Sequence, residues 1–252
     1  MKKILMLAFT ATMMLVACKK DKGGDEPETI PTCATVKTVE RLGNSVYNNT
    51  NAIKFDSQGR IKEENDTFES FLYEYQSDKI TVTYSYPGNE YLSTLTLDNK
   101  GRVTKIDNRY GTFEYEYNSD GYLIKETSTE AGSATTSFTW ESGNLVKIVK
   151  TNNGTSYTTN ITYSNDVITD KLIAANVYDN IYGFDTFRLY QYFGKHPKNA
   201  PILEQNNNTN SGYTANYSYT KDNNGKINAF NIESISTNNP YEWGVSVDYN
   251  CK

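Results

Sequence analysis

The sequence predicts an all-β protein, an antiparallel meander of about 14 strands curled or closed into a soluble barrel. Three observations predict this class. The 252 residues include 21 tyrosines, and 13% of the chain is aromatic, a composition that favours strands. Turn sequences recur about every twenty residues. The segments between them alternate apolar and polar side chains with a period of two, as strands with one buried face do.

The chain begins with an expected lipoprotein signal peptide over residues 1–17. Lys2 and Lys3 precede an apolar stretch at 4–16, which is too short to cross a bilayer as a helix and fits a secretory signal. The stretch ends in LVAC at residues 15–18, which resembles the lipobox of bacterial lipoproteins. This resemblance implies that Cys18 becomes the first residue, that its thiol carries lipid, and that the membrane is a partner through that lipid.

A flexible tether is expected next, over residues 18–31. The segment KKDKGGDEPETIP at 19–31 is charged and almost without apolar residues, so it cannot bury enough surface to pack. Lysine and acidic residues after Cys18 resemble the surface-export signal of Bacteroidota lipoproteins. The expected location is therefore the outer membrane, with the cell surface favoured over the periplasmic face. Residues 32–252 are predicted to form a single β-repeat domain.

Two further cysteines, Cys33 and Cys251, stand near the two ends of this domain. In an oxidising envelope a disulfide between them is possible. It would join the first and last strands and would require their Cα atoms to lie within about 7 Å of each other. The alternative is that Cys33 remains a free thiol in the tether.

The repeated unit is centred on a turn. Residues 55–61 (FDSQGRI), 97–103 (LDNKGRV) and 117–123 (YNSDGYL) are three copies, shorter turns follow positions 75, 140 and 163, and a last copy occupies 219–227. An Asp or Asn side chain starts such a turn, and Gly occupies the position that needs positive φ. Loops of this length with Gly connect β-hairpins. Seven hairpins give the predicted strand number.

The strands between these turns are expected to have one aromatic face. Phe71, Tyr73 and Tyr75 alternate with Leu72 and Glu74. Residues 82–86 and 113–117 follow the same pattern, with Thr, Ser and Glu on the second face. This pattern is typical of antiparallel strands with one face in water.

The pattern aromatic-Asp-x-x-Gly-Arg-aliphatic resembles the YD repeats of RHS proteins over about residues 52–170 and again at 219–230, with Phe-Asp, Leu-Asp and Tyr-Asn in place of Tyr-Asp. Residues 194–201 (GKHPKNAP), together with the lipobox, make the chain similar to a Bacteroidota outer-membrane lipoprotein family of unknown function. That family is described as having a porin-like fold. The resemblance implies a fold and no activity.

Residues 170–204 interrupt the repeat. Their apolar residues are partly spaced as on a helix, which predicts a short helical insertion near 170–195 that supplies apolar bulk where hairpins alone would leave a hollow. Pro197 and Pro201 are expected to end it. The alternative is a hydrophobic loop lying over a sheet edge. The residues of the predicted helical stripe are Leu172, Ile173, Val177 and Ile181.

Composition excludes several functions. Lys and Arg number 25 against 30 Asp and Glu, so no basic surface for nucleic acid is predicted. Three cysteines and one histidine cannot form a Cys/His metal site, and no cofactor is expected. His196 would have to serve any Ser-His-Asp or Cys-His site, yet it is expected to lie exposed in a loop beside Pro197. The protein is therefore not predicted to be an enzyme.

A non-catalytic binding module, for a glycan or another envelope ligand, is the predicted function. Aromatic rings on a rigid sheet can stack on sugar faces, although each such ring can equally be packed across strands. An exposed coplanar aromatic pair in a concave groove would favour the ligand. The alternative is a structural or accessory outer-membrane protein that binds a protein partner. The candidate stacking residues, each near a turn, are Tyr86, Tyr91, Tyr110 and Trp243.

Overall fold

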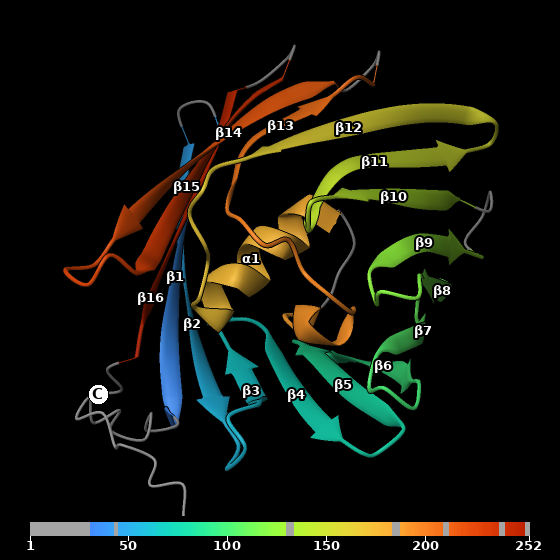
Figure 1. Ribbon diagram of the computed structural model, residues 1–252. Helices are drawn as coiled ribbons and strands as arrows, with labels where there is room; N and C mark the ends of the chain where they lie inside the picture. The colour runs from blue at the N-terminus through green and yellow to red at the C-terminus, as the bar shows by residue number, and fades with distance from the viewer. Residues whose placement is uncertain are drawn as a thin grey trace, which may run out of the picture.

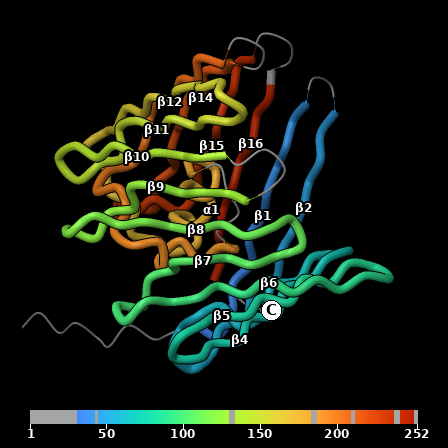
Figure 2. Tube along the Cα trace, turned by 90° about the vertical axis from the view of Figure 1, so that its right-hand side faces the viewer, coloured from blue at the N-terminus to red at the C-terminus, as the bar shows by residue number. Residues whose placement is uncertain are grey.

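The computed structural model describes residues 31–42, 45–129, 134–182, 187–208, 212–236 and 240–249. Sixteen strands of these residues form one closed antiparallel barrel, in which each strand pairs with its neighbours in sequence and β1 pairs with β16. Figure 1 looks into the barrel, and Figure 2 shows strands β7 to β12 side by side along its wall. The predicted all-β meander is confirmed, and it is closed rather than only curled.

The strands are β1 (Cys33–Leu42), β2 (Ser45–Phe55), β3 (Ile61–Asn65), β4 (Ser70–Tyr75), β5 (Lys79–Tyr86), β6 (Asn89–Leu97), β7 (Val103–Asn108), β8 (Gly111–Tyr117), β9 (Leu123–Ser128), β10 (Thr135–Glu141), β11 (Asn144–Asn152), β12 (Thr155–Tyr163), β13 (Pro201–Asn206), β14 (Tyr213–Lys221), β15 (Ile227–Ser236) and β16 (Pro240–Asp248).

Barrel closure depends on β1 and β16, the two strands that do not belong to the seven repeated hairpins. The seven repeated turns account for β2 to β15, whereas β1 and β16 flank them and pair with each other from Thr35 opposite Asp248 to Leu42 opposite Tyr241. This pairing gives both terminal strands a second neighbour, so the sheet has no open edge. The expectation of about 14 strands was therefore two short of the described number.

The turns at 55–61 and 97–103 share one hydrogen-bond pattern. The Asp98 carboxylate accepts bonds of 2.9 Å from the backbone N–H groups of Lys100 and Arg102. The Arg102 guanidinium also donates to it and lies 4.4 Å from the ring centroid of Tyr117. Burial opposes ionisation, but these hydrogen bonds lower the pKa of Asp98 below its ordinary value. The same contacts recur two repeats earlier, made by Asp56, Arg60 and Tyr75.

At five of the seven repeated turns, the aromatic residue before the turn also bonds across to the neighbouring strand. Five such rings donate a hydrogen bond to a backbone carbonyl at the start of the preceding strand, at 2.6–2.9 Å. The repeated turns and these rings form one end of the barrel, here called the turn end. The opposite end is called the mouth. The five rings are Tyr75, Tyr117, Trp140, Tyr163 and Tyr219.

The insertion between β12 and β13 fills the barrel lumen and is here called the plug (residues 164–200, as far as described). It contains α1 (Lys171–Tyr182) and the short 3-10 helix η1 (Tyr190–Tyr192), and Figure 1 shows both within the ring of strands. Asp170 caps α1 by accepting the N–H groups of Leu172 and Ile173 at 3.0 Å. All four residues of the predicted helical stripe are buried. The helical insertion is confirmed, and the alternative of a loop over a sheet edge is wrong.

The last part of the plug joins the turn end. The Lys195 N–H donates to the Gly121 carbonyl at 2.9 Å, and the Lys198 N–H donates to the Gly143 carbonyl at the same distance. Residues 194–200 thereby bind two of the repeated turns, so the lumen is covered at this end. No helix of the described residues is long and apolar enough to cross a bilayer.

His196 was expected to be exposed, and this was wrong. Its ring packs between Tyr178 and Tyr190, with centroid distances of 5.7 and 4.6 Å. Its Nδ1 is buried and has no hydrogen-bond partner among the described residues. Burial lowers the pKa of His196 to about 4, because the charged imidazolium would lose its hydration there.

His196 should make the protein less stable in mild acid. In the unfolded chain the imidazole takes up a proton near pH 6.5, whereas in the folded protein it does so only near pH 4. Stability from this group is therefore present above pH 6.5 and is lost as the pH falls towards 4. We expect the free energy of unfolding to fall by about 2 kcal/mol more in the wild type than in His196→Phe between pH 7 and 4.5.

Urea unfolding of both proteins at the two pH values measures this difference. His196 is the only histidine of the chain, so contributions from carboxylates occur in both proteins and cancel. Equal losses in the two proteins would contradict the buried, neutral state of His196.

Candidate functional site

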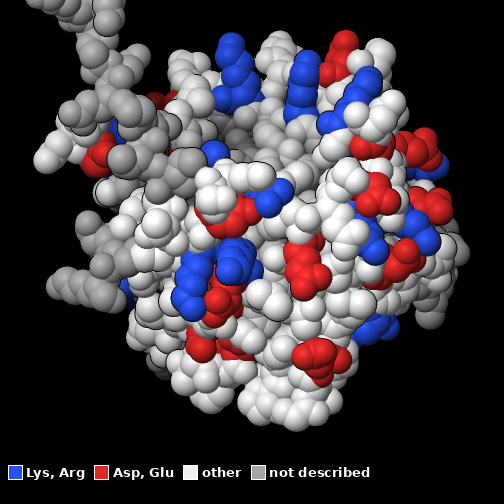
Figure 3. Space-filling model, turned by 90° about the horizontal axis from the view of Figure 1, so that it is seen from below, with Lys and Arg blue, Asp and Glu red and all other residues white. Residues whose placement is uncertain are grey.

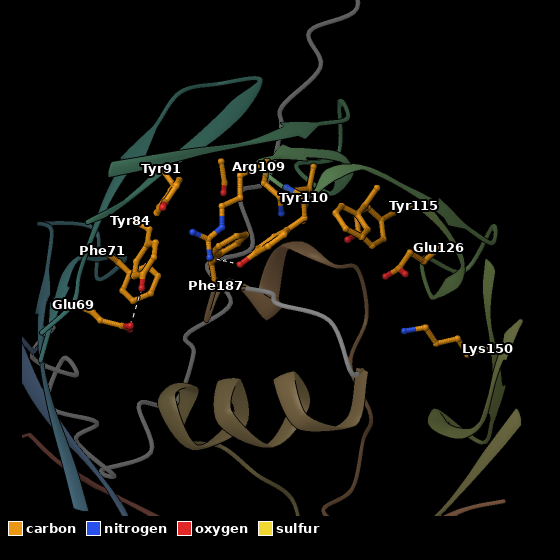
Figure 4. A pocket seen from close by; sticks show the side chains of 14 residues that line it. Glu69, Phe71, Tyr84, Tyr91, Arg109, Tyr110, Tyr115, Glu126, Lys150 and Phe187 are labelled. Carbon is orange, nitrogen blue, oxygen red and sulfur yellow. Dashed lines mark hydrogen bonds between the residues drawn. The ribbon is translucent and has the colours of Figure 1, made fainter. Parts of the chain in front are cut away.

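The candidate site is a cavity of about 440 Å³ in the lumen, between the mouth and the plug. Strands β4 to β9 supply most of its wall, and Phe187 of the plug contributes to its lining. Figure 4 shows the labelled side chains converging on this space above α1. Small-molecule sites are concave and mainly apolar with a few polar groups, and this cavity has that character.

Three aromatic rings stand side by side on one wall of the cavity. Phe71, Tyr84 and Tyr91 belong to consecutive strands, and the register places Phe71 opposite Tyr84 and Tyr84 opposite Tyr91. The first pair has a centroid distance of 5.0 Å, and the second has 5.9 Å with an interplanar angle of 18°. All three residues lie at inward positions of the alternating strands, so a row of stacked aromatic rings lines the cavity.

Arg109 extends this surface from the β7–β8 turn. Its guanidinium carbon lies 4.0 Å from the ring centroid of Tyr91 and 4.5 Å from that of Tyr110, which are cation–π distances. The guanidinium also donates a hydrogen bond to the Tyr110 hydroxyl. These contacts hold the cation at the mouth of the cavity.

A carboxylate fixes the central ring. The Tyr84 hydroxyl donates to Glu69 at 2.7 Å (dashed in Figure 4). This hydrogen bond raises the pKa of Tyr84 to about 12, because ionising the hydroxyl would place two negative charges together. Tyr84 is therefore a neutral donor at physiological pH, and its ring is held in one orientation.

The plug is fixed to the barrel wall beside the cavity. Phe187 and Arg188 both have left-handed backbones, with φ of 51° and 55°, a conformation unfavourable for residues with a Cβ. The Arg188 guanidinium forms a buried ion pair with Glu64 of β3, with Nε–O distances of 2.8 and 2.7 Å. This pair compensates for the unfavourable backbone and positions Phe187 in the cavity.

A second chamber of about 180 Å³ adjoins the first, and Glu126 and Lys150 line both. Its lining is mainly polar and includes Glu204, which is 1% exposed. Burial raises the pKa of Glu204, although the hydroxyls of Tyr213 and Tyr217 donate hydrogen bonds to it. The lumen therefore offers an aromatic chamber next to a polar one.

The structure brings two of the four predicted stacking residues together. Tyr91 and Tyr110 line the cavity, on either side of Arg109. Tyr86 is 47% exposed and lies outside this cavity, in a shallow hollow beside Phe68. Trp243 is half-buried and packs edge-on against Phe230 at 5.5 Å, which makes it a core contact.

Several residues of the site were not predicted. Alternation could have placed Phe71 and Tyr84 beside Tyr91, because all three belong to aromatic strand faces. The only sequence signal that could have identified Arg109 as a site residue is its position in a turn beside Tyr110. No local signal distinguishes Glu126, Lys150 or Phe187, since their proximity follows from barrel closure and from the plug.

The predicted cysteine sites fall largely outside the described residues. Cys18 and Cys251 both lie there, so the lipidation site and the proposed bridge stay predictions. Cys33, at the start of β1, is disulfide-bonded, and a free thiol at this position is therefore excluded. In the described part of the chain, no group of three or more His, Cys, Asp or Glu residues is suited to holding a metal ion.

Comparison with known proteins identifies the fold. The model of a family described as a domain of unknown function (DUF4595) with porin-like fold matches residues 48–228. A crystal structure of a porin-like protein from Bacteroides uniformis has a TM-score of 0.68 at 17% identity, covering 88% of this chain and 98% of that one. A porin-like protein from Bacteroides vulgatus has a TM-score of 0.60 at 18% identity, covering 86% and 98%. No curated protein matches the sequence at a significant level.

Proposed function

This chain belongs to the family of domains of unknown function with porin-like fold, and we propose that it is a non-catalytic binding module. Its lumen cavity would take a ligand with a flat ring face, a glycan or another envelope ligand. The observation that supports this most directly is the stacked pair Tyr84 and Tyr91, whose nearly parallel planes differ by 18° inside a concave cavity. Rings held in this way offer apolar contact area at little entropic cost.

The filled lumen favours binding over conduction. A barrel of about sixteen strands is wide enough for an aqueous channel. Here α1 occupies that space, and residues 194–200 bind the repeated turns across one end. The described residues therefore form a cup, open at the mouth, rather than an open pore.

The barrel exterior supports a domain that stands in water. A membrane-spanning barrel has an outward apolar band, whereas the outward positions of β5, β10 and β14 are Thr, Ser, Asn, Lys and Glu. Acidic and basic side chains are intermixed on the face shown in Figure 3. We therefore propose that lipid on Cys18 and the tether 18–31 attach the domain to the outer membrane, on the cell surface. The intact mass of the membrane-extracted protein tests the anchor, because an unmodified Cys18 would contradict it.

A glycan array followed by calorimetric titration of its hits tests the binding function. Replacing Tyr91 with alanine removes one ring of the stacked pair and a cation–π partner of Arg109. We expect affinity to fall by about tenfold or more, because a stacked ring contributes roughly 1–3 kcal/mol. Melting temperature should change little, since Tyr91 lies at the rim of the cavity.

Tyr86→Ala is the matched control, because it removes an exposed tyrosine of the neighbouring strand outside the cavity. Equal losses for the two variants would place the ligand elsewhere. No array binding, together with a specific protein partner captured by crosslinking, would instead support the accessory role.

A further inference from the structure

Two cationic side chains that line the aromatic chamber, Arg109 and Lys150, form no ion pair among the described residues. The chain has five arginines, and four of them form ion pairs: Arg41, Arg60, Arg102 and Arg188. Arg109 lacks a carboxylate within ion-pairing distance among the described residues, and so does Lys150. Both line the aromatic chamber. An anionic group on a ligand would supply the missing partner.

Arg109 is already held in the orientation that an anion needs. Stacking on Tyr91 and Tyr110 fixes the plane of its guanidinium, and Figure 4 shows the side chain directed into the cavity. The Tyr110 hydroxyl uses one of its five N–H donors. A planar fork of this kind matches a carboxylate through two parallel hydrogen bonds.

The nearby carboxylates do not occupy the Arg109 guanidinium, which therefore remains available for an anionic group of a ligand. Glu69 accepts the Tyr84 hydroxyl, and Glu204 accepts two tyrosine hydroxyls at the far side of the second chamber. Glu126 is buried, accepts a hydrogen bond from the Thr136 hydroxyl, and points towards Lys150 in Figure 4. Lys150 can donate a hydrogen bond to a hydroxyl group of a ligand.

The second chamber suits a ligand with several hydroxyl groups. Its lining combines hydroxyl and amide groups that both donate and accept hydrogen bonds. Each of these groups has at least one hydrogen-bond partner in the protein and keeps further donor or acceptor positions, which ligand hydroxyl groups can use. The lining groups concerned are Thr136, Thr159, Asn180, Asn206 and Tyr213.

We propose that the lumen binds an acidic sugar, that is, a saccharide bearing a ring carboxylate. Its ring packs against Tyr84 and Tyr91, its carboxylate binds the Arg109 fork, and its hydroxyl groups extend past Lys150 into the polar chamber. This inference rests on the proposed binding function and adds the charge and chemical class of the ligand.

Calorimetric titration with matched probes tests the inference. The probes are short oligosaccharides of glucuronic, galacturonic and mannuronic acid, their methyl esters, the corresponding neutral oligosaccharides, and benzoate. We expect at least one acid to bind about tenfold or more tightly than its methyl ester, because a charge-assisted bidentate contact is lost in the ester. Affinity for the acid should also fall with salt.

The variant Arg109→Gln should remove this discrimination. We expect it to bind the acid about tenfold more weakly while affinity for the ester stays within about twofold. Arg41→Gln is the matched control, since it removes an exposed arginine outside the cavity. Thermal melting verifies that both variants are folded, which is expected because Arg109 is exposed in a turn.

The outcomes separate this inference from the proposed function. Neutral oligosaccharides that bind in a Tyr91-dependent manner, with acids binding no better, would overturn the inference and leave the binding module intact. Benzoate binding as tightly as the acids would overturn the sugar assignment. Absence of binding by every acid overturns the inference, and absence of Tyr91-dependent binding across the whole glycan array also overturns the proposed function.

Discussion

Replacing Glu64 with alanine is expected to lower the free energy of unfolding by about 3–5 kcal/mol. The Glu64 side chain is 4% exposed and that of Arg188 is 14% exposed, and the Arg188 guanidinium also donates to the Asn176 side chain of α1 at 2.6 Å. Without Glu64 a buried cation would lose its counter-charge, while the plug would lose its attachment to β3. Urea unfolding at pH 7 measures the loss.

Glu63→Ala is the matched control for this variant. Glu63 is the preceding residue and pairs with Lys54 at the surface, at 3.1 Å. Removing an exposed pair of this kind should cost less than about 1 kcal/mol. The double variant Glu64→Leu with Arg188→Met should regain most of the loss, because it removes both buried charges. A Glu64→Ala protein as stable as the Glu63→Ala protein would show that the pair does not secure the plug.

Replacing Gly194 with alanine is expected to destabilise the protein by about 2–5 kcal/mol. Gly194 has φ of +82°, and a Cβ at this position would lie 2.4 Å from the Gly121 carbonyl oxygen and 2.9 Å from the Tyr117 ring. That carbonyl also accepts the Lys195 N–H at 2.9 Å. The methyl group would therefore push the plug away from the turn that it binds.

Gly154→Ala separates this steric contact from backbone strain. Gly154 has nearly the same φ, +78°, but its added Cβ would meet nothing within 4 Å. The free energy of unfolding of the Gly154→Ala protein should fall only by the strain of an alanine in the left-handed conformation, about 1–2 kcal/mol. Comparable unfolding midpoints for the two variants would contradict the close approach of residue 194 to the repeated turn.

Much of the fold could be predicted because its signals are local. Asp98 and its equivalents accept hydrogen bonds from backbone groups two and four residues away, so each turn is specified by a few adjacent residues. Alternation likewise placed Tyr73 and Tyr115 on the buried face, where both are at most 5% exposed. The stripe from Leu172 to Ile181 predicted the helix through the same kind of short-range periodicity.

The candidate site was only partly predictable. Tyr91 and Tyr110 were identified as aromatic residues near turns, but so were Tyr86 and Trp243, which the structure places elsewhere. Near a turn, ring orientation and the shape of the neighbouring wall decide whether a side chain faces a cavity. Neither is encoded in the few residues around the ring.

The sequence by itself determined the strands, their aromatic inner face, the repeated turns and the helical insertion, because short-range spacing specifies each of them. Only the tertiary structure decided that β1 meets β16, that the insertion enters the lumen, and that Arg109, Glu126 and Phe187 surround one cavity. These residues come from distant parts of the chain, and barrel closure brings them together. The same packing buries Nδ1 of His196 and pairs Glu64 with Arg188, which lie 124 residues apart. Such contacts depend on how all the strands close around the plug, and no local pattern specifies that arrangement.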